Sequence, residues 1–130
     1  MSKLPLQPSE YWARQCYTGS SFIRPHEVPS RHKVGVDSIM WGSDYPHKES
    51  CCPYSTEALR AAFADCERTE IEQMLGLNAA DVYGFDLKKL APIAAKIGPK
   101  VDDVAIPLPV GGVPKEAERC PAFVGLAADA

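Results

Sequence analysis

The chain has 130 residues, which is room for one modest domain and excludes a multidomain protein. Its 14 Lys and Arg stand against 17 Asp and Glu, so it carries no basic surplus for binding nucleic acid. With 45% hydrophobic and 24% charged residues, wholesale disorder is excluded, and no apolar run approaches the roughly 20 residues that cross a bilayer.

The N-terminus and the cysteines indicate the compartment. Residues 1–8 contain one cation and no apolar stretch, so we expect no secretory signal and a cytoplasmic location. Five cysteines without a C-x-x-C pair suit free thiols in a reducing compartment. A zinc site at Cys51, Cys52 and His47 is disfavoured, because structural zinc sites pair their cysteines at C-x(2–4)-C spacing and need a second pair.

The first half of the chain predicts two strands joined by a short helix. Residues 10–18 are rich in aromatic and small apolar side chains between turn signals, which predicts a strand. Residues 26–33 predict a short polar helix with Pro29 in its first turn. The apolar run at 38–42 does not alternate with polar residues, which predicts a strand covered on both faces in a parallel sheet.

A helix is predicted to begin near Ser55. Its apolar residues recur at helical spacing and would pack on the sheet: Ala58, Leu59, Ala62, Phe63 and Cys66.

Two more helical segments are predicted after it. Thr69 and Glu72 have the spacing of a capping box, so a helix should begin there. Asn78 is suited to cap a turn at residues 79–83, which Gly84 would end.

The C-terminal third predicts one further helix and then a tail. Asp86 should cap a helix over residues 87–97, and Pro92 should break or kink it near Ala91. Residues 100–130 are rich in Pro and Gly without a periodic face, which predicts an extended or disordered arm.

The predicted order of strand, helix, strand and helices indicates an α/β fold, but an incomplete one. Two strands do not make a stable parallel sheet, because both faces and both edges need cover. The sequence therefore indicates part of a larger architecture.

The residues with the clearest chemical potential are 41–47, WGSDYPH, which follow the second predicted strand. Small residues beside Asp44 let a ligand or metal approach the backbone closely. Chemistry in parallel α/β folds sits at the carboxyl ends of strands, where Asp44 falls. Asp44 is therefore a candidate metal ligand or general base, and equally a candidate cap for the following turn.

These residues resemble a known family. The run GVDSIMWGSDYPH at residues 35–47 is similar to the last-strand signature of the amidohydrolase-related family, in the branch that includes aminocarboxymuconate-semialdehyde decarboxylase and related metal-dependent hydrolases. PSEY at residues 8–11 resembles that family's entry into strand seven, and NAADVYGFD at residues 78–86 its closing helix. The resemblance extends in order over roughly residues 8–99.

The resemblance implies that residues 1–99 are the C-terminal segment of a (β/α)8 TIM-barrel domain. It further implies a mononuclear divalent metal, usually zinc, that activates a water for hydrolysis or decarboxylation of a small organic substrate. Asp44 matches the family's acid that ends strand eight, binds the metal and takes part in catalysis. His47 follows the motif in many relatives, where it lines the substrate pocket.

The chain also departs from the family. A complete barrel runs to about 250 residues. The family's His-x-His pair has no counterpart, since the three histidines are His26, His32 and His47. Because a catalytic zinc needs about three protein ligands, we expect this chain to hold no metal tightly and to be inactive alone. The alternative is a non-catalytic fragment that completes a barrel with an upstream half or self-associates through its sheet edges.

Overall fold

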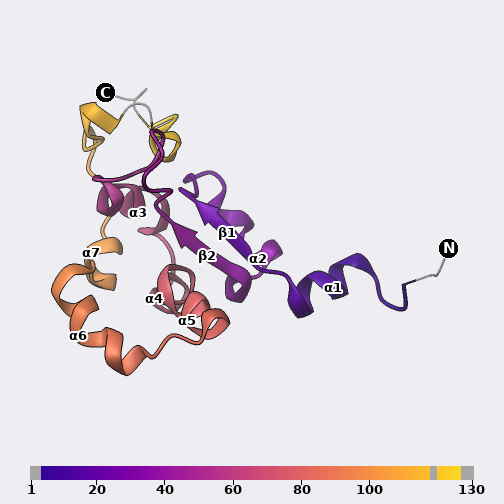
Figure 1. The fold of residues 1–130 in the computed structure, drawn as a ribbon. Helices are drawn as coiled ribbons and strands as arrows, with labels where there is room; N and C mark the ends of the chain where they lie inside the picture. Colours follow the sequence, from indigo (N-terminus) through magenta and orange to yellow (C-terminus); the bar gives the residue numbers. More distant parts are fainter. Residues whose placement is uncertain (1–3, 118–119, 127–130) are drawn as a thin grey trace.

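The computed structural model describes residues 4–117 and 120–126, which form a small α/β unit (Figure 1). The helices and strands are α1 Pro8–Gln15, β1 Thr18–Ser21, α2 Arg31–Val34, β2 Ile39–Gly42, α3 Ser55–Phe63, α4 Arg68–Glu72, α5 Asn78–Tyr83, α6 Leu87–Ile97 and α7 Val101–Val104. None of the helices in the described ranges combines the length and apolarity that crossing a membrane takes. Residues 1–3, on which the expected absence of a secretory signal partly rests, lie outside the description.

The two strands form a parallel sheet. Thr18 pairs with Ile39 and Ser21 pairs with Gly42, so both strands end at the same edge. Parallel strands need a crossover between them, and α2 lies in that connection. The predicted α/β class is confirmed by this sheet, whereas the described residues do not themselves form a barrel.

One face of the sheet is covered by the core. Side chains alternate along a strand, so Ile39 and Trp41 point to one face and Met40 to the other. Helices cover the first face, and the buried cluster there consists of Val28, Ile39, Leu59, Phe63, Cys66, Ile71, Met74 and Val104. On the second face Gly19 is exposed and Met40 is only partly covered. The predicted cover on both faces is therefore not provided by the described residues.

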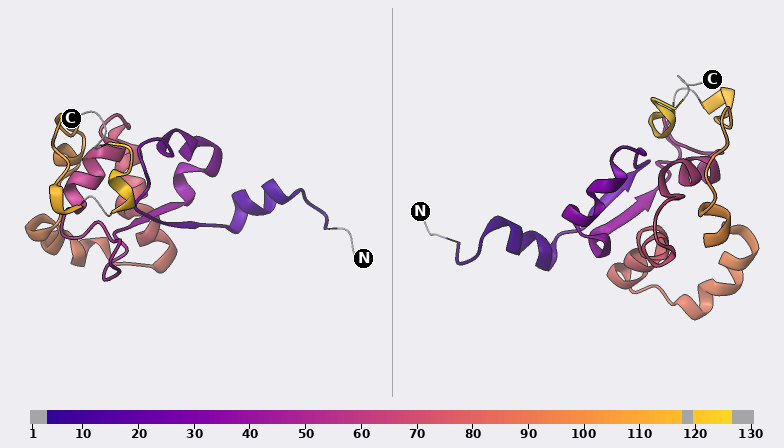
Figure 2. Two further views of the ribbon diagram at one scale, coloured as in Figure 1. Left: turned by 90° about the horizontal axis from the view of Figure 1, so that it is seen from above. Right: turned by 180° about the vertical axis from the view of Figure 1, so that it is seen from behind.

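The predicted strand over residues 10–18 is wrong, because most of this segment forms α1 and the strand begins at Thr18. Proline occupies the first position of α1, where its missing amide costs nothing. The backbone amide of Gln7 donates to the Glu10 carboxylate at 2.7 Å, which fixes the helix start. These local contacts outweigh the strand preference of the aromatic residues. Figure 2 shows α1 projecting away from the rest of the chain, consistent with its lack of buried residues.

The short helix predicted over residues 26–33 is divided. A 3-10 turn at Val28–Ser30 contains Pro29 and leads into α2, which Gly35 caps at its C-terminal end. The crossover is nevertheless helical as expected. Its buried contribution to the core is Val28.

The helix predicted from Ser55 is confirmed as α3. It packs against both the sheet and the C-terminal segment. Phe63 is fully buried. The Arg60 guanidinium donates to the carbonyl oxygens of Ile106 and Pro107, both at 2.8 Å. A second buried cluster joins the start of α3 to the C-terminal segment: Cys51, Ala58, Ala117, Cys120, Ala122 and Phe123.

The arm predicted over residues 100–130 is therefore packed, not extended, where the structure describes it. Val104 and Phe123 are nearly inaccessible, at 1% and 2% exposure. Short helical turns, which the Pro-rich sequence permits, let these side chains reach α3. Residues 118–119 and 127–130 of this prediction lie outside the described residues.

The segment from α4 to α5 is a continuous helical stretch. A π-helical turn at Gln73–Leu77 joins the two helices. The turn predicted over residues 79–83 is present as part of α5, but Asn78 does not cap it, because Asn78 lies inside the continuous helical stretch. The predicted capping box also does not form, since α4 begins at Arg68 without a side-chain cap. Gly84 ends α5 in the left-handed conformation, as predicted, with φ of 66°.

Asn78 instead holds β2 in place. Its side-chain amide donates to the carbonyl oxygens of Val36 at 2.7 Å and Ile39 at 2.8 Å. Both carbonyls precede or begin β2, so one buried side chain fixes the entry of the strand against α5.

The helix α6 is capped as predicted. The Asp86 carboxylate accepts from the backbone amides of Lys88 at 3.0 Å and Lys89 at 3.2 Å. The predicted break near Ala91 is absent, because α6 runs through Pro92 to Ile97.

Replacing Asn78 by Ala should destabilise the fold by about 1–3 kcal/mol, because two carbonyl groups lose their donor. Chemical denaturation followed by circular dichroism measures the change. Asp81→Ala, on an exposed position of the same helix, is the control and should change stability by no more than about 0.5 kcal/mol. Equal effects of the two variants would contradict the role of Asn78 in holding β2 in place.

Candidate functional site

The candidate site is the loop that follows β2. The backbone amide of Cys51 donates to the carbonyl oxygen of Ser43 at 3.1 Å, which closes a loop over residues 44–50. Asp44, His47 and Glu49 all lie in this closed loop. The loop therefore stands at the carboxyl end of the sheet, where parallel α/β folds place their chemistry.

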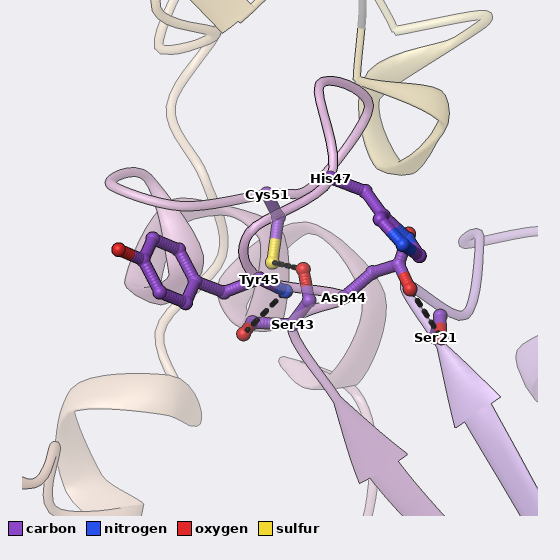
Figure 3. Close-up of polar contacts among 6 residues, drawn as sticks. All are labelled: Ser21, Ser43, Asp44, Tyr45, His47 and Cys51. Carbon is purple, nitrogen blue, oxygen red and sulfur yellow. Dashed lines mark hydrogen bonds and ion pairs between the residues drawn. The ribbon is translucent and has the colours of Figure 1, made fainter.

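Asp44 links the ends of the two strands. The hydroxyl of Ser21, the last residue of β1, donates to Asp44 Oδ1 at 3.5 Å (Figure 3). The other carboxylate oxygen, Oδ2, lies 3.0 Å from His47 Nδ1. Among the described residues the hydrogen-bond partners of this carboxylate are side chains, so the alternative role of Asp44 as a cap of the next turn is not what its contacts show.

Both strands end in a strained backbone. Phe22 and Asp44 follow β1 and β2 with φ of 42° and 62°. The left-handed region costs little for Asp, whose short polar side chain tolerates it, but more for a bulky residue. Strain of about 1–3 kcal/mol at such positions is kept only where the surroundings enforce it, and it concentrates at functional sites.

His47 is the second predicted site residue, and the structure brings it to Asp44. The hydrogen bond to the Asp44 carboxylate and the negative charge of that group raise the pKa of His47, with a smaller contribution from Glu49. The His47 side chain is 68% exposed whereas that of Asp44 is 21% exposed. The imidazole therefore connects a half-buried carboxylate to solvent.

Three ligand-type atoms gather in this loop. Asp44, His47 and Glu49 each place one such atom within 4.8 Å of the others. Carboxylate oxygen and imidazole nitrogen are donors that divalent cations accept. Glu49 and Ser21 were not predicted. Ser21 could have been found from its position at the end of a strand. The strand was predicted over residues 10–18, so its true end at Ser21 was missed.

Cys51 serves packing. Its thiol lies 3.6 Å from the carbonyl oxygen of Ser43 and 3.5 Å from the hydroxyl of Ser55. Burial raises the pKa of Cys51, which keeps it a neutral thiol. Cys52 is exposed, and both are free thiols.

Replacing Asp44 by Asn should return the pKa of His47 toward its ordinary value, because the negative charge is lost. Glu49→Gln, the control, should lower it less. Below the ordinary pKa of histidine, the ion pair of His47 with Asp44 stabilises the loop. This stabilisation is lost as the pH rises through the raised pKa of His47. NMR titration of the His47 ring measures both variants, and an unchanged pKa in Asp44→Asn would refute the pairing.

Comparison with known proteins identifies the family. A family model described as amidohydrolase matches residues 4–85, which is more than half of the chain. No curated protein and no solved structure matched the chain. The matched region contains both strands, the candidate loop and the helices up to α5. Amidohydrolases are hydrolase-type enzymes of a TIM-barrel superfamily that generally bind divalent metals. The chain therefore belongs to the amidohydrolase family.

Proposed function

We propose that this chain supplies the last two strands of an amidohydrolase barrel, with Asp44 as a metal ligand and as the carboxylate that accepts a proton from the attacking water. The reaction would be hydrolysis or decarboxylation of a small organic substrate, of the kind carried out by the aminocarboxymuconate-semialdehyde decarboxylase branch. The observation that carries the proposal is the position of Asp44, just beyond β2 and hydrogen-bonded to the end of β1. This is the edge of the sheet at which barrel enzymes assemble their active sites.

The donors present fit one position of such a metal centre. Asp44 offers a carboxylate at the strand end, and its neighbours His47 and Glu49 lie close enough to share a cation. Zinc in a catalytic site takes about three protein ligands and a water. The family's histidine pair is absent from the sequence, so we infer that further ligands come from a larger assembly.

A bound divalent metal would lower the pKa of its water from 15.7 toward about 7. The residues of this chain then handle the proton. Asp44 Oδ2 is suited to accept it, and His47 Nδ1 is 3.0 Å away. Since the pKa of His47 is raised by Asp44, the imidazole holds its proton to a higher pH than an ordinary histidine, and its exposure lets it exchange that proton with solvent. Ser21 keeps the other oxygen, Oδ1, toward β1.

The chain alone should bind zinc weakly and turn over no substrate, because one strand-end carboxylate and an exposed loop do not make a closed coordination shell. Isothermal titration with zinc and metal analysis after dialysis measure this. The matched variant Asp44→Asn should lose the remaining weak binding, whereas Asp37→Asn, at the other end of β2, should retain it. About one tightly held zinc per chain would contradict the proposal of an incomplete site.

A second function, as a non-catalytic interaction partner, is favoured by the sheet itself. Each strand has one edge without a strand partner in the described part of the chain, and unpaired edges are templates for further pairing. The partly open face at Gly19 and Met40 adds surface that a barrel interior would cover.

Light scattering coupled to size-exclusion chromatography tests this second function. A chain that pairs through its edges should show a mass that rises with concentration. Gly19→Pro on β1 should reduce the association, because it removes an amide donor from the edge that does not pair with β2. Val110→Pro, in an exposed turn outside the sheet, is the control. A concentration-independent monomer that unfolds cooperatively would argue against any need for a partner.

A further inference from the structure

The helix α6 is amphipathic, yet none of its residues is buried. At 100° per residue, Leu87, Leu90 and Ile97 fall on one face, and Lys88 and Lys96 fall on the other. The exposed fractions of the apolar residues run from 40% at Leu90 to 76% at Ile97. An apolar stripe of this kind normally packs on a core, so its exposure requires an explanation.

Both ends of α6 are anchored. The Asp86 side chain caps its first turn. Beyond its last turn, the backbone amide of Lys100 donates to the Asp103 carboxylate at 2.9 Å, and Val104 of α7 is fully buried. The helix is thus held in place at its termini while its middle spans the side of the molecule, as the outward arc of Figure 1 shows.

An apolar cavity lies between α6 and the core. Its volume is about 440 Å³, and its walls include Trp41, Leu59, Ile71, Leu75, Ala94 and Ile97. A volume of 300–1,000 Å³ with mainly apolar walls and few polar groups is typical of small-molecule sites. Glu72 and Lys100 provide the charges at this cavity.

We propose that this cavity binds a small amphiphile of the fatty-acid class, with its apolar chain between α6 and Trp41 and its carboxylate at Lys100. An apolar chain suits these walls, because its contact with them removes apolar surface from water. Glu72 repels a carboxylate, which directs the head group toward Lys100. The site is separate from Asp44, since Trp41 points to the core face of the sheet and Asp44 lies beyond the strand end.

The shape of the cavity argues for a small molecule and against a second copy of the chain as the occupant. Its walls all come from one chain, so a small molecule fills it without a matching surface from a partner.

The test is NMR titration of the intact chain with sodium decanoate, below the concentration at which decanoate aggregates. The indole N–H signal of Trp41 should shift saturably. Trp12, on the projecting α1, is the internal control and should not move in parallel. Absence of a saturable Trp41 shift, or equal shifts of both indoles as expected of a detergent effect, would overturn the proposal.

Variants locate the ligand. Ile97→Asp should weaken decanoate binding about tenfold, because an apolar contact is lost, and the position is exposed enough that folding is retained. Lys100→Gln should weaken it roughly threefold, whereas Lys96→Gln on the far face should not change it. Unchanged affinity in Ile97→Asp, or a dimer whose formation excludes decanoate, would refute the site. Equal affinity for decylamine would refute the role of Lys100.

Discussion

The parallel pairing of β1 with β2 is the interaction on which the rest of the structure depends. Four residue pairs in register bring two strand ends to the same edge, and that edge is where Ser21 meets Asp44. A one-residue slip would turn Ile39 out of the core and move the site away from β1. The crossover through α2, the clamp from Asn78 and the packing of α3 all maintain this register.

Much of the fold followed from local rules. The sites of β2, α3, the end of α5 at Gly84 and the cap at Asp86 were predicted because each depends on residues near in sequence. The start of β1 was wrong, since a proline and a Glu10 contact favour a helix where aromatic side chains suggested a strand. The role of Asn78 was unpredictable, because its partners lie some forty residues away in the chain.

Two residues of the candidate site, Asp44 and His47, were named from the motif that follows the strand, and their functional roles stay predictions. Asp44 stands in a compact motif after a strand, and the resemblance carried by that motif is confirmed at the level of the family. Ser21 was not predicted, because only the register of the two strands places it beside Asp44. A single sequence does not reveal that register. The ion pair of His47 with Asp44 depends on a turn between these two residues, which are three positions apart in the sequence. The backbone amide of His47 donates to the carbonyl oxygen of Asp44 at 2.9 Å and closes this turn.

The hydrogen bonds from Arg60 to the carbonyl oxygens of Ile106 and Pro107 join α3 to a segment that lies outside the region matched by the family model. The matched region stops at residue 85, but Phe123 and Ala122 lie in the same buried cluster as Ala58. Ending the chain at residue 85 would expose to water the side of α3 that packs against the C-terminal segment. A chain shortened to the matched region should consequently aggregate, because it would lack the side chains that bury this part of α3.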